Sequence, residues 1–347
     1  MQSKVITILL AAQTALNQLD VKHADDNESP LHAHDFRNRL LFADLGNGLD
    51  IEYYGDFWDD GEPCAWGIFL EAIAKPTIAN NLTSLRMMGP DEGANGNRTH
   101  DFTQLLNTKA HFPQLLALTI RQTNVTHHNF ADIKDGQIRP LIARCPNLQA
   151  LTLPQAPKPN FFELALPNLR YLDIGMAWQT HDFIQHLAAS NNMPTLKALS
   201  FSDAISVFEA QNIAKKQASI MAQKTALAQS KANTSQLLQS VLGYSAEQLA
   251  EIEAMQANAM LEADKNSEFD DSITAFADYC ALFQSKRLKQ GSVFHLRNAF
   301  LTADEFLYLQ AMRPDLQFSA SIEAPHVYIN HWAGKFNKPY QHLIIPR

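Results

Sequence analysis

Two histidine pairs are the first residues in this chain whose types and spacing could do chemistry. His32 and His34 lie in the stretch "HAHD", and His127 and His128 are adjacent. A catalytic zinc needs three converging protein ligands, and paired histidines on a helix usually follow H-x-x-x-H or HExxH. Neither pair has that spacing, although His32 and His34 would share one face of a strand. We therefore expect solvated loop histidines, no metal site and no cofactor.

An acidic turn is the next candidate. The stretch "DFWDDGEP" groups Asp56, Asp59, Asp60 and Glu62 and could bind a cation, but its spacing is not that of a calcium-binding loop. The glycine-rich residues 89–97 lack the Lys-Ser/Thr of a phosphate-binding loop, and the chain has no G-x-S-x-G. The sequence therefore identifies no catalytic residue, and we expect no enzyme. An enzyme or metal-binding protein that uses this N-terminal segment remains the alternative.

Composition narrows the class of protein. The 347 residues are 46% hydrophobic and 18% charged, which is enough to build a sizeable core. The formal net charge of −8 disfavours binding to nucleic acid or to anionic lipid. Cys64, Cys145 and Cys280 form no C-x-x-C or cluster, which fits a reducing cytoplasm. The apolar run 5–12 is too short to span a membrane, and we expect a first helix there rather than a cleaved leader.

One short sequence phrase recurs along the chain and predicts the strands that must position any functional side chains. The stretches "FPQLLALTI", "CPNLQALTL", "LPNLRYLDI" and "MPTLKALSF" share Pro-x-Leu-x-x-Leu-x-apolar, and "NNLTSLRM" has Asn in place of Pro. Their second leucines are Leu85, Leu118, Leu151, Leu172 and Leu199, which are 33, 33, 21 and 27 residues apart. Weaker units follow at "VFHLRNAF" and "RPDLQFSAS". The Leu-x-Leu pair should point inward from a short strand, with helical segments between strands. Thr302 and Glu305 fit a capping box at the start of a helix after the "VFHLRNAF" unit.

This pattern resembles the leucine-rich repeat, and the segment "NFADIKDGQIRPLIARCPNLQALTL" is similar to those of an uncharacterised bacterial family of such proteins. The match covers 78–204 and 273–322. The expected fold is α/β: a right-handed α/β horseshoe, or leucine-rich repeat solenoid, with a parallel sheet on its concave face, helices on its convex face and a helical insertion. The resemblance implies an interaction scaffold and brings no catalytic residues.

The expected organisation has four parts. Residues 1–77 form an N-terminal cap of helix, β-hairpin and helix, and 78–204 hold the repeats. Residues 205–272 form a helical insertion rich in Ala and Gln, and 273–347 hold the last repeats and a C-terminal cap. The insertion either decorates the surface, binds a partner or assembles an oligomer, and the oligomeric state stays open.

The expected binding surface follows from strand geometry, because the residues that alternate with the inward leucines face the other side. We predict that another protein binds there, and that the modestly basic strip suits an acidic loop or helix. An inhibitor or immunity-like protein that sequesters an enzyme is the narrower alternative. The predicted contact residues are Arg86, Met88, Thr119, Arg121, Thr152, Tyr171, Asp173, Ser200, His295 and Arg297.

Overall fold

The computed structural model describes residues 2–26, 38–46, 48–55, 64–89, 97–121, 130–177, 179–204, 274–285, 287–299 and 301–321. The chain divides into two compact units, one of Met1–Ile205 together with Ser272–Arg347 and one of Ser206–Asp271. The residues that the structure describes all belong to the first unit. The helical insertion predicted at 205–272 lies outside the described residues, as do residues 322–347 of the predicted C-terminal cap.

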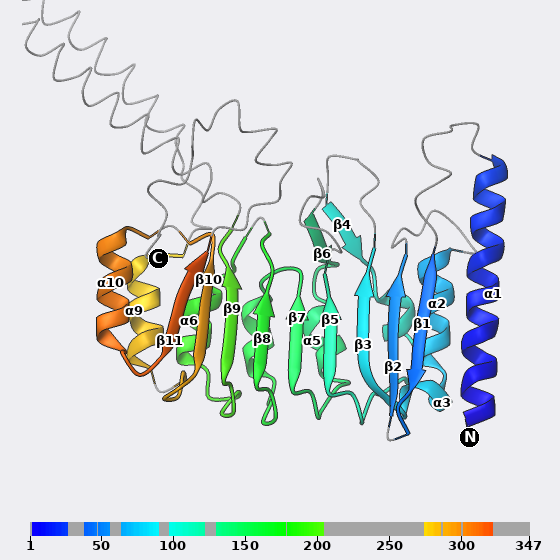
Figure 1. Ribbon diagram of the computed structural model, residues 1–347, viewed down its shortest axis with the longest axis horizontal. Coiled ribbons are helices and arrows are strands. Elements are labelled where there is room, and N and C mark those ends of the chain that lie inside the picture. Colours follow the sequence, from blue (N-terminus) through cyan, green and yellow to red (C-terminus); the bar gives the residue numbers. More distant parts are fainter. Residues whose placement is uncertain are drawn as a thin grey trace, which may run out of the picture. The chain divides into compact units, whose positions relative to one another are not determined.

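The protein is an α/β protein, and its described part is built around a mixed, mostly parallel sheet of nine strands (Figure 1). The strand order is β1-β2-β3-β5-β7-β8-β9-β10-β11. From β2 onwards each strand is parallel to its neighbour, and β1 runs antiparallel to β2. The bounds are β1 Arg39–Asp44, β2 Leu49–Tyr54, β3 Leu82–Met88, β5 Ala117–Ile120, β7 Ala150–Leu153, β8 Tyr171–Ile174, β9 Ala198–Ser202, β10 Val293–Arg297 and β11 Gln317–Ser321.

The repeated leucines line up across this sheet. From β3 to β9 they form one row of register partners: Leu85, Leu118, Leu151, Leu172 and Leu199. Phe294 in β10 and Phe318 in β11 continue that row. Each of the leucines is buried, whereas the residues before and after it in the strand are half-buried or exposed. Because strand side chains alternate between faces, the predicted division into inward and outward residues is confirmed.

Helices cover one face of the sheet. In Figure 1, α2, α3, α5 and α6 lie behind the strands, α1 lies beside β1, and α9 and α10 lie at the β11 end. Short helices precede β5, β7 and β9, as the sequence predicts, and Phe183, Ile184 and Leu187 of α6 are fully buried. The bounds are α1 Gln2–Asp26, α2 Ala65–Ala74, α3 Pro76–Ala79, α4 Thr103–Leu106, α5 Ile138–Ile142, η1 (a 3₁₀ helix) Pro159–Glu163, α6 Phe183–Ala189, α9 Phe276–Gln284 and α10 Ala303–Met312.

The N-terminal segment extends the same sheet. β1 and β2 form the predicted hairpin, and β2 then pairs in parallel with β3. The helix α1 packs against β1 and α2, with Leu9 and Leu16 fully buried. Tyr53 of β2 stacks on Phe69 of α2 with ring centroids 4.4 Å apart. The hairpin is confirmed, and its strand β2 brings new side chains onto the face that the repeats form.

The predicted capping box of α10 is also present. The backbone N–H of Glu305 donates to Thr302 Oγ1 at 3.2 Å, and the backbone N–H of Thr302 donates to the Glu305 carboxylate at 2.7 Å. Two of the backbone donors that open the helix are satisfied in this way. The helix therefore begins where the sequence predicts.

A second, two-stranded sheet was not predicted. β4 (Asn97–His100) pairs in parallel with β6 (Phe130–Ile133). Just after β4, Asp101 accepts hydrogen bonds from the Thr103 backbone N–H (2.8 Å), Gln137 (2.8 Å) and Lys134 (2.6 Å). Burial opposes the charge of Asp101, but these hydrogen bonds outweigh it and hold the pKa of its carboxyl well below the usual range. Neither strand carries the repeated phrase that predicts the four-residue strands of the main sheet.

Candidate functional site

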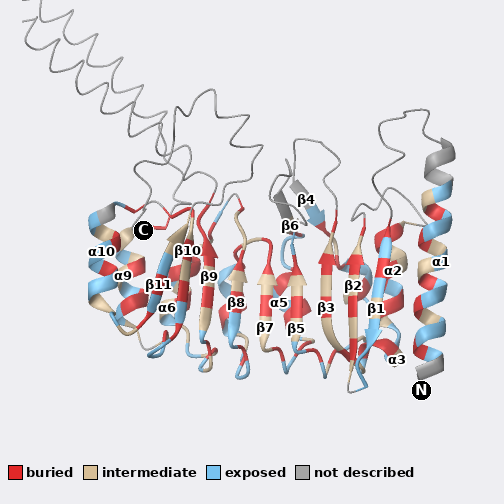
Figure 2. Ribbon diagram, in the orientation of Figure 1, coloured by how far each residue is buried: buried red, intermediate tan, exposed pale blue. Residues whose placement is uncertain are grey.

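Two rows of side chains cross the face of the sheet that no described helix covers, and we call this surface the open face (Figure 2). All ten predicted contact residues lie on it, so the residues that the sequence assigns to one surface do share one face of the sheet. Its first row is Asp50, Ser84, Ala117, Ala150, Tyr171, Ala198, Val293 and Gln317, and its second row is Glu52, Arg86, Thr119, Thr152, Asp173, Ser200, His295 and Ser319. Near the carboxyl ends of their strands it also includes Met88, Arg121 and Arg297.

Arg86 is held by carboxylates of the neighbouring strand. Its Nε lies 2.8 Å from Glu52 Oε2, and its Nη2 lies 3.3 Å from Asp50 Oδ2. The hydrogen bond to Glu52, together with the charge of Asp50, raises the pKa of the guanidinium further above its usual value. The charge of Arg86 is therefore balanced within the protein.

Arg297 is paired in the same way at the other end of the open face. Its Nη2 reaches across β9 to β8, where it donates to Asp173 Oδ1 at 2.5 Å and to the carbonyl of Ile174 at 2.6 Å. Between them, β9 carries the short side chains of Ser200 and Ser202. The Arg297 side chain is only 18% exposed, so it is a fixed part of the surface.

His295 is engaged through both ring nitrogens. Nδ1 lies 2.8 Å from Ser319 Oγ, and Nε2 lies 2.9 Å from Ser321 Oγ. A serine hydroxyl can donate or accept, so either tautomer of the neutral ring is satisfied. His295 is therefore a structural link between β10 and β11.

These contacts correct one expectation about charge. The arginines alone predict a modestly basic strip, but Asp50, Glu52 and Asp173 lie beside them and neutralise Arg86 and Arg297. Arg121 differs, because it is exposed and forms no ion pair with any other residue that the structure describes.

The least polar part of the open face surrounds Tyr171, whose side chain is 54% exposed. Its register partners are Ala150 in β7 and Ala198 in β9, and Val293, which is 40% exposed, follows in β10. With Ala117 of β5 these residues make an apolar row across five neighbouring strands. We call it the Tyr171 row.

Sequence reasoning missed the side chains that β1 and β2 add to this face. The guanidinium of Arg39 lies over the Tyr54 ring, 4.6 Å from its centroid, and Leu41 is 56% exposed opposite Glu52. The signal was the alternation in "LDIEYY", which places Asp50, Glu52 and Tyr54 on one side. The sequence predicts the hairpin as a separate cap, whereas β2 continues the main sheet by pairing with β3.

A buried carboxylate lies at the end of β9, beside the residues that flank the predicted insertion. Asp203 is fully buried and accepts from the backbone N–H of Ala204 (2.9 Å), from the backbone N–H and hydroxyl of Thr274 (both 3.2 Å), and from the Tyr279 hydroxyl (3.0 Å). Burial raises the pKa of Asp203 to about 6, although these hydrogen bonds oppose the change. Asp203 therefore joins the chain before the insertion to the chain after it.

The residues of the alternative enzyme or metal site lie outside the described part of the chain. These are His32, His34, Asp56, Asp59, Asp60 and Glu62, and the separate pair of His127 and His128 lies outside it as well. Among the described residues no group of three or more His, Cys, Asp or Glu side chains could hold a metal ion. No helix in the same part of the chain has both the length and the apolar character to cross a membrane.

Comparisons of the chain with protein-family models, curated proteins and solved structures found no match.

Proposed function

We propose that this protein is a cytoplasmic scaffold that binds another protein on the open face and has no catalytic activity of its own. The Tyr171 row carries this proposal, because this apolar row, with Tyr171 and Val293 exposed and its alanines partly exposed, crosses five strands where no described helix covers it. Exposed apolar patches rimmed by polar residues commonly mark interaction sites. Tyrosine is among the residue types that most often dominate binding energy at protein interfaces.

The partner that fits is a protein segment with apolar side chains and a nearby carboxylate. The apolar side chains would bury Tyr171 and the alanines beside it, and the carboxylate would reach Arg121, whose charge is not balanced by any described residue. The ion pairs of Arg86 and Arg297 hold the ends of the face in place before binding. Such preorganisation lowers the entropy that binding costs.

We also propose that the fold is a leucine-rich repeat solenoid. Seven strands, β3, β5, β7, β8, β9, β10 and β11, add to the sheet in chain order and keep one register, which supports this class. An experimental structure with right-handed crossovers and a constant rotation between units is the expected result. A sheet that closes on itself would contradict it.

A narrower form of the proposal is that the partner is an enzyme, which this protein inhibits. A face fixed by internal ion pairs suits tight one-to-one binding. Mixing the protein with its captured partner should then abolish the partner's activity at a ratio of one to one. Weak binding to several unrelated proteins would exclude the proposal that this protein is an enzyme inhibitor.

Site-specific photo-crosslinking tests the surface. A benzoylphenylalanine replaces Tyr171, and a control replaces Gln185, which is exposed on α6 behind the sheet. We expect a defined crosslinked protein from position 171 that is absent from position 185. The captured protein, once purified, should bind the wild type and bind Arg121→Glu more weakly.

Arg121→Glu is a cleaner probe than charge reversal at Arg86 or Arg297, because those two changes would also break ion pairs inside the protein. Equal crosslinking from positions 171 and 185 would reject the open face as the site. Unchanged binding by both single variants, Arg121→Glu and Tyr171→Ala, would reject it as well.

A further inference from the structure

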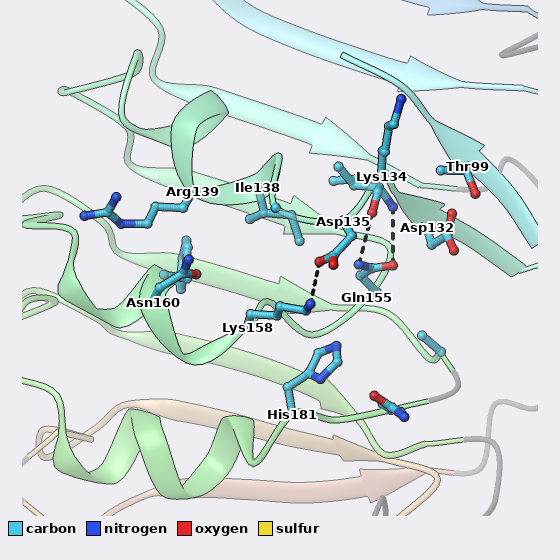
Figure 3. A pocket seen from close by; sticks show the side chains of 15 residues that line it. Thr99, Asp132, Lys134, Asp135, Ile138, Arg139, Gln155, Lys158, Asn160 and His181 are labelled. Atoms are coloured by element: carbon cyan, nitrogen blue, oxygen red, sulfur yellow. Dashed lines mark hydrogen bonds and ion pairs between the residues drawn. The ribbon is translucent and has the colours of Figure 1, made fainter. Parts of the chain in front are cut away.

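A pocket of about 370 Å³ lies apart from the open face, and its size is that of a small-ligand site (Figure 3). Its lining residues come mainly from the segments that follow β6, β7 and β8. In α/β proteins ligands commonly bind beyond the carboxyl ends of parallel strands, where loops hold the functional side chains.

One end of the pocket is formed by Asp132 and Thr99, which face each other across the β4–β6 pair. Asp132 Oδ1 is buried and has no hydrogen-bond partner among the residues that the structure describes. Burial raises the pKa of this carboxyl, although a hydrogen bond with Thr99 opposes the change. A buried acceptor without a donor is costly, so this oxygen is a place where a ligand N–H would be stabilising.

The middle of the pocket holds an ion pair. Lys158 Nζ lies 2.6 Å from Asp135 Oδ1, but both side chains are half exposed or more, so a ligand anion can share the lysine. Figure 3 shows His181 beside this pair, with Gln155 between Asp132 and Lys158. Burial, followed by the charge of Lys158, lowers the pKa of His181, so its ring is neutral at pH 7.

Backbone geometry and apolar residues complete the site. His181 and Asp182 both have left-handed backbone angles, with φ of 50° and 52°, which are uncommon outside glycine and often accompany function. Gln155 is fixed, because its amide bonds both the N–H and the carbonyl of Ile133 at 3.3 and 3.4 Å. Ile133, Ile138 and Phe161 supply buried apolar lining.

We propose that this pocket binds a small zwitterion, an α-amino acid with an apolar side chain, whose ammonium group donates to Asp132 Oδ1 and whose carboxylate pairs with Lys158. The apolar side chain contacts Ile133 and Ile138, because Phe161 has no exposed surface. This assignment is independent of the open face and of any protein partner.

The test is a calorimetric titration of the full chain with each of the twenty protein amino acids. We expect leucine, isoleucine, valine, methionine or phenylalanine to bind and glycine and aspartate not to bind. The N-acetyl and the amide derivatives of the bound amino acid each remove one charge and should lose at least tenfold in affinity.

Two variants localise the binding. Asp132→Asn keeps the shape of the side chain and removes its charge, and Lys158→Gln lies on an exposed position where folding is not at risk. Each should weaken binding at least tenfold, whereas Lys197→Gln, an exposed lysine outside the pocket, should not. The proposal is overturned if no amino acid binds, if the acetylated form binds equally well, or if Lys158→Gln has the affinity of Lys197→Gln.

Discussion

Asp203 offers the sharpest test of the described packing. The carboxylate is fully buried between the chain that enters the predicted insertion and the chain that leaves it. Asp203→Asn keeps the shape and an acceptor oxygen for Ala204 and Thr274, and removes the charge. The Tyr279 hydroxyl can turn to accept from the new amide. The substitution therefore isolates the cost of burying the charge.

The magnitude follows from the pKa of Asp203, which burial raises from 3.8 to about 6. At about 1.4 kcal/mol for each pH unit between these values, ionisation in the folded state costs about 3 kcal/mol. Because the folded pKa is the higher one, the stabilisation is fully present below about pH 4. It is lost as the pH rises through about 6.

The assay is urea unfolding of the wild type and of Asp203→Asn at several pH values. The free energy of unfolding of the wild type, relative to the variant, should fall by about 2 kcal/mol between about pH 4 and pH 7.5. Tyr279→Phe removes a hydrogen bond that lowers the pKa of Asp203. The pKa should therefore rise further, and the decrease in the free energy of unfolding with pH should be larger. A difference between wild type and Asp203→Asn that does not change with pH would refute the reasoning.

Three further predictions concern single side chains. Leu151→Ala, in the middle of the sheet, should lower the free energy of unfolding by about 2–5 kcal/mol, whereas Thr152→Ala beside it should change it by less than about 0.5 kcal/mol. Thr302→Ala removes the capping box of α10 and should cost about 1 kcal/mol, measured by the same unfolding experiment. Burial raises the pKa of Cys145 to about 12, so at pH 8 a thiol reagent should modify the partly exposed Cys64 first and Cys145 only after unfolding.

The sheet was predictable because its information is local. In "CPNLQALTL", Leu151 and Leu153 alternate with small residues, and the phrase returns along the chain. Alternation determines which side chains point inward, and repetition predicts that the strands stack in register. The hairpin of β1 and β2 and the capping box of Thr302 were readable for the same reason.

The chemistry of the open face was not predictable, because its contacts join distant parts of the chain. Arg86 and Glu52 are 34 residues apart, and Arg297 and Asp173 are 124 apart. Without the strand order, an arginine on an outward position looks like a free cation. The pocket at Asp132 depends in the same way on pairing between β4 and β6, two strands that carry no copy of the repeated phrase.

The central claim is that the open face binds a protein, and the most direct test is an affinity measurement with the protein captured at position 171. We expect Tyr171→Ala to weaken this binding at least tenfold, or about 1.4 kcal/mol, and Gln185→Ala behind the sheet to change it less than about twofold. Equal affinities for the wild type and Tyr171→Ala, or a larger loss from Gln185→Ala, would contradict the claim.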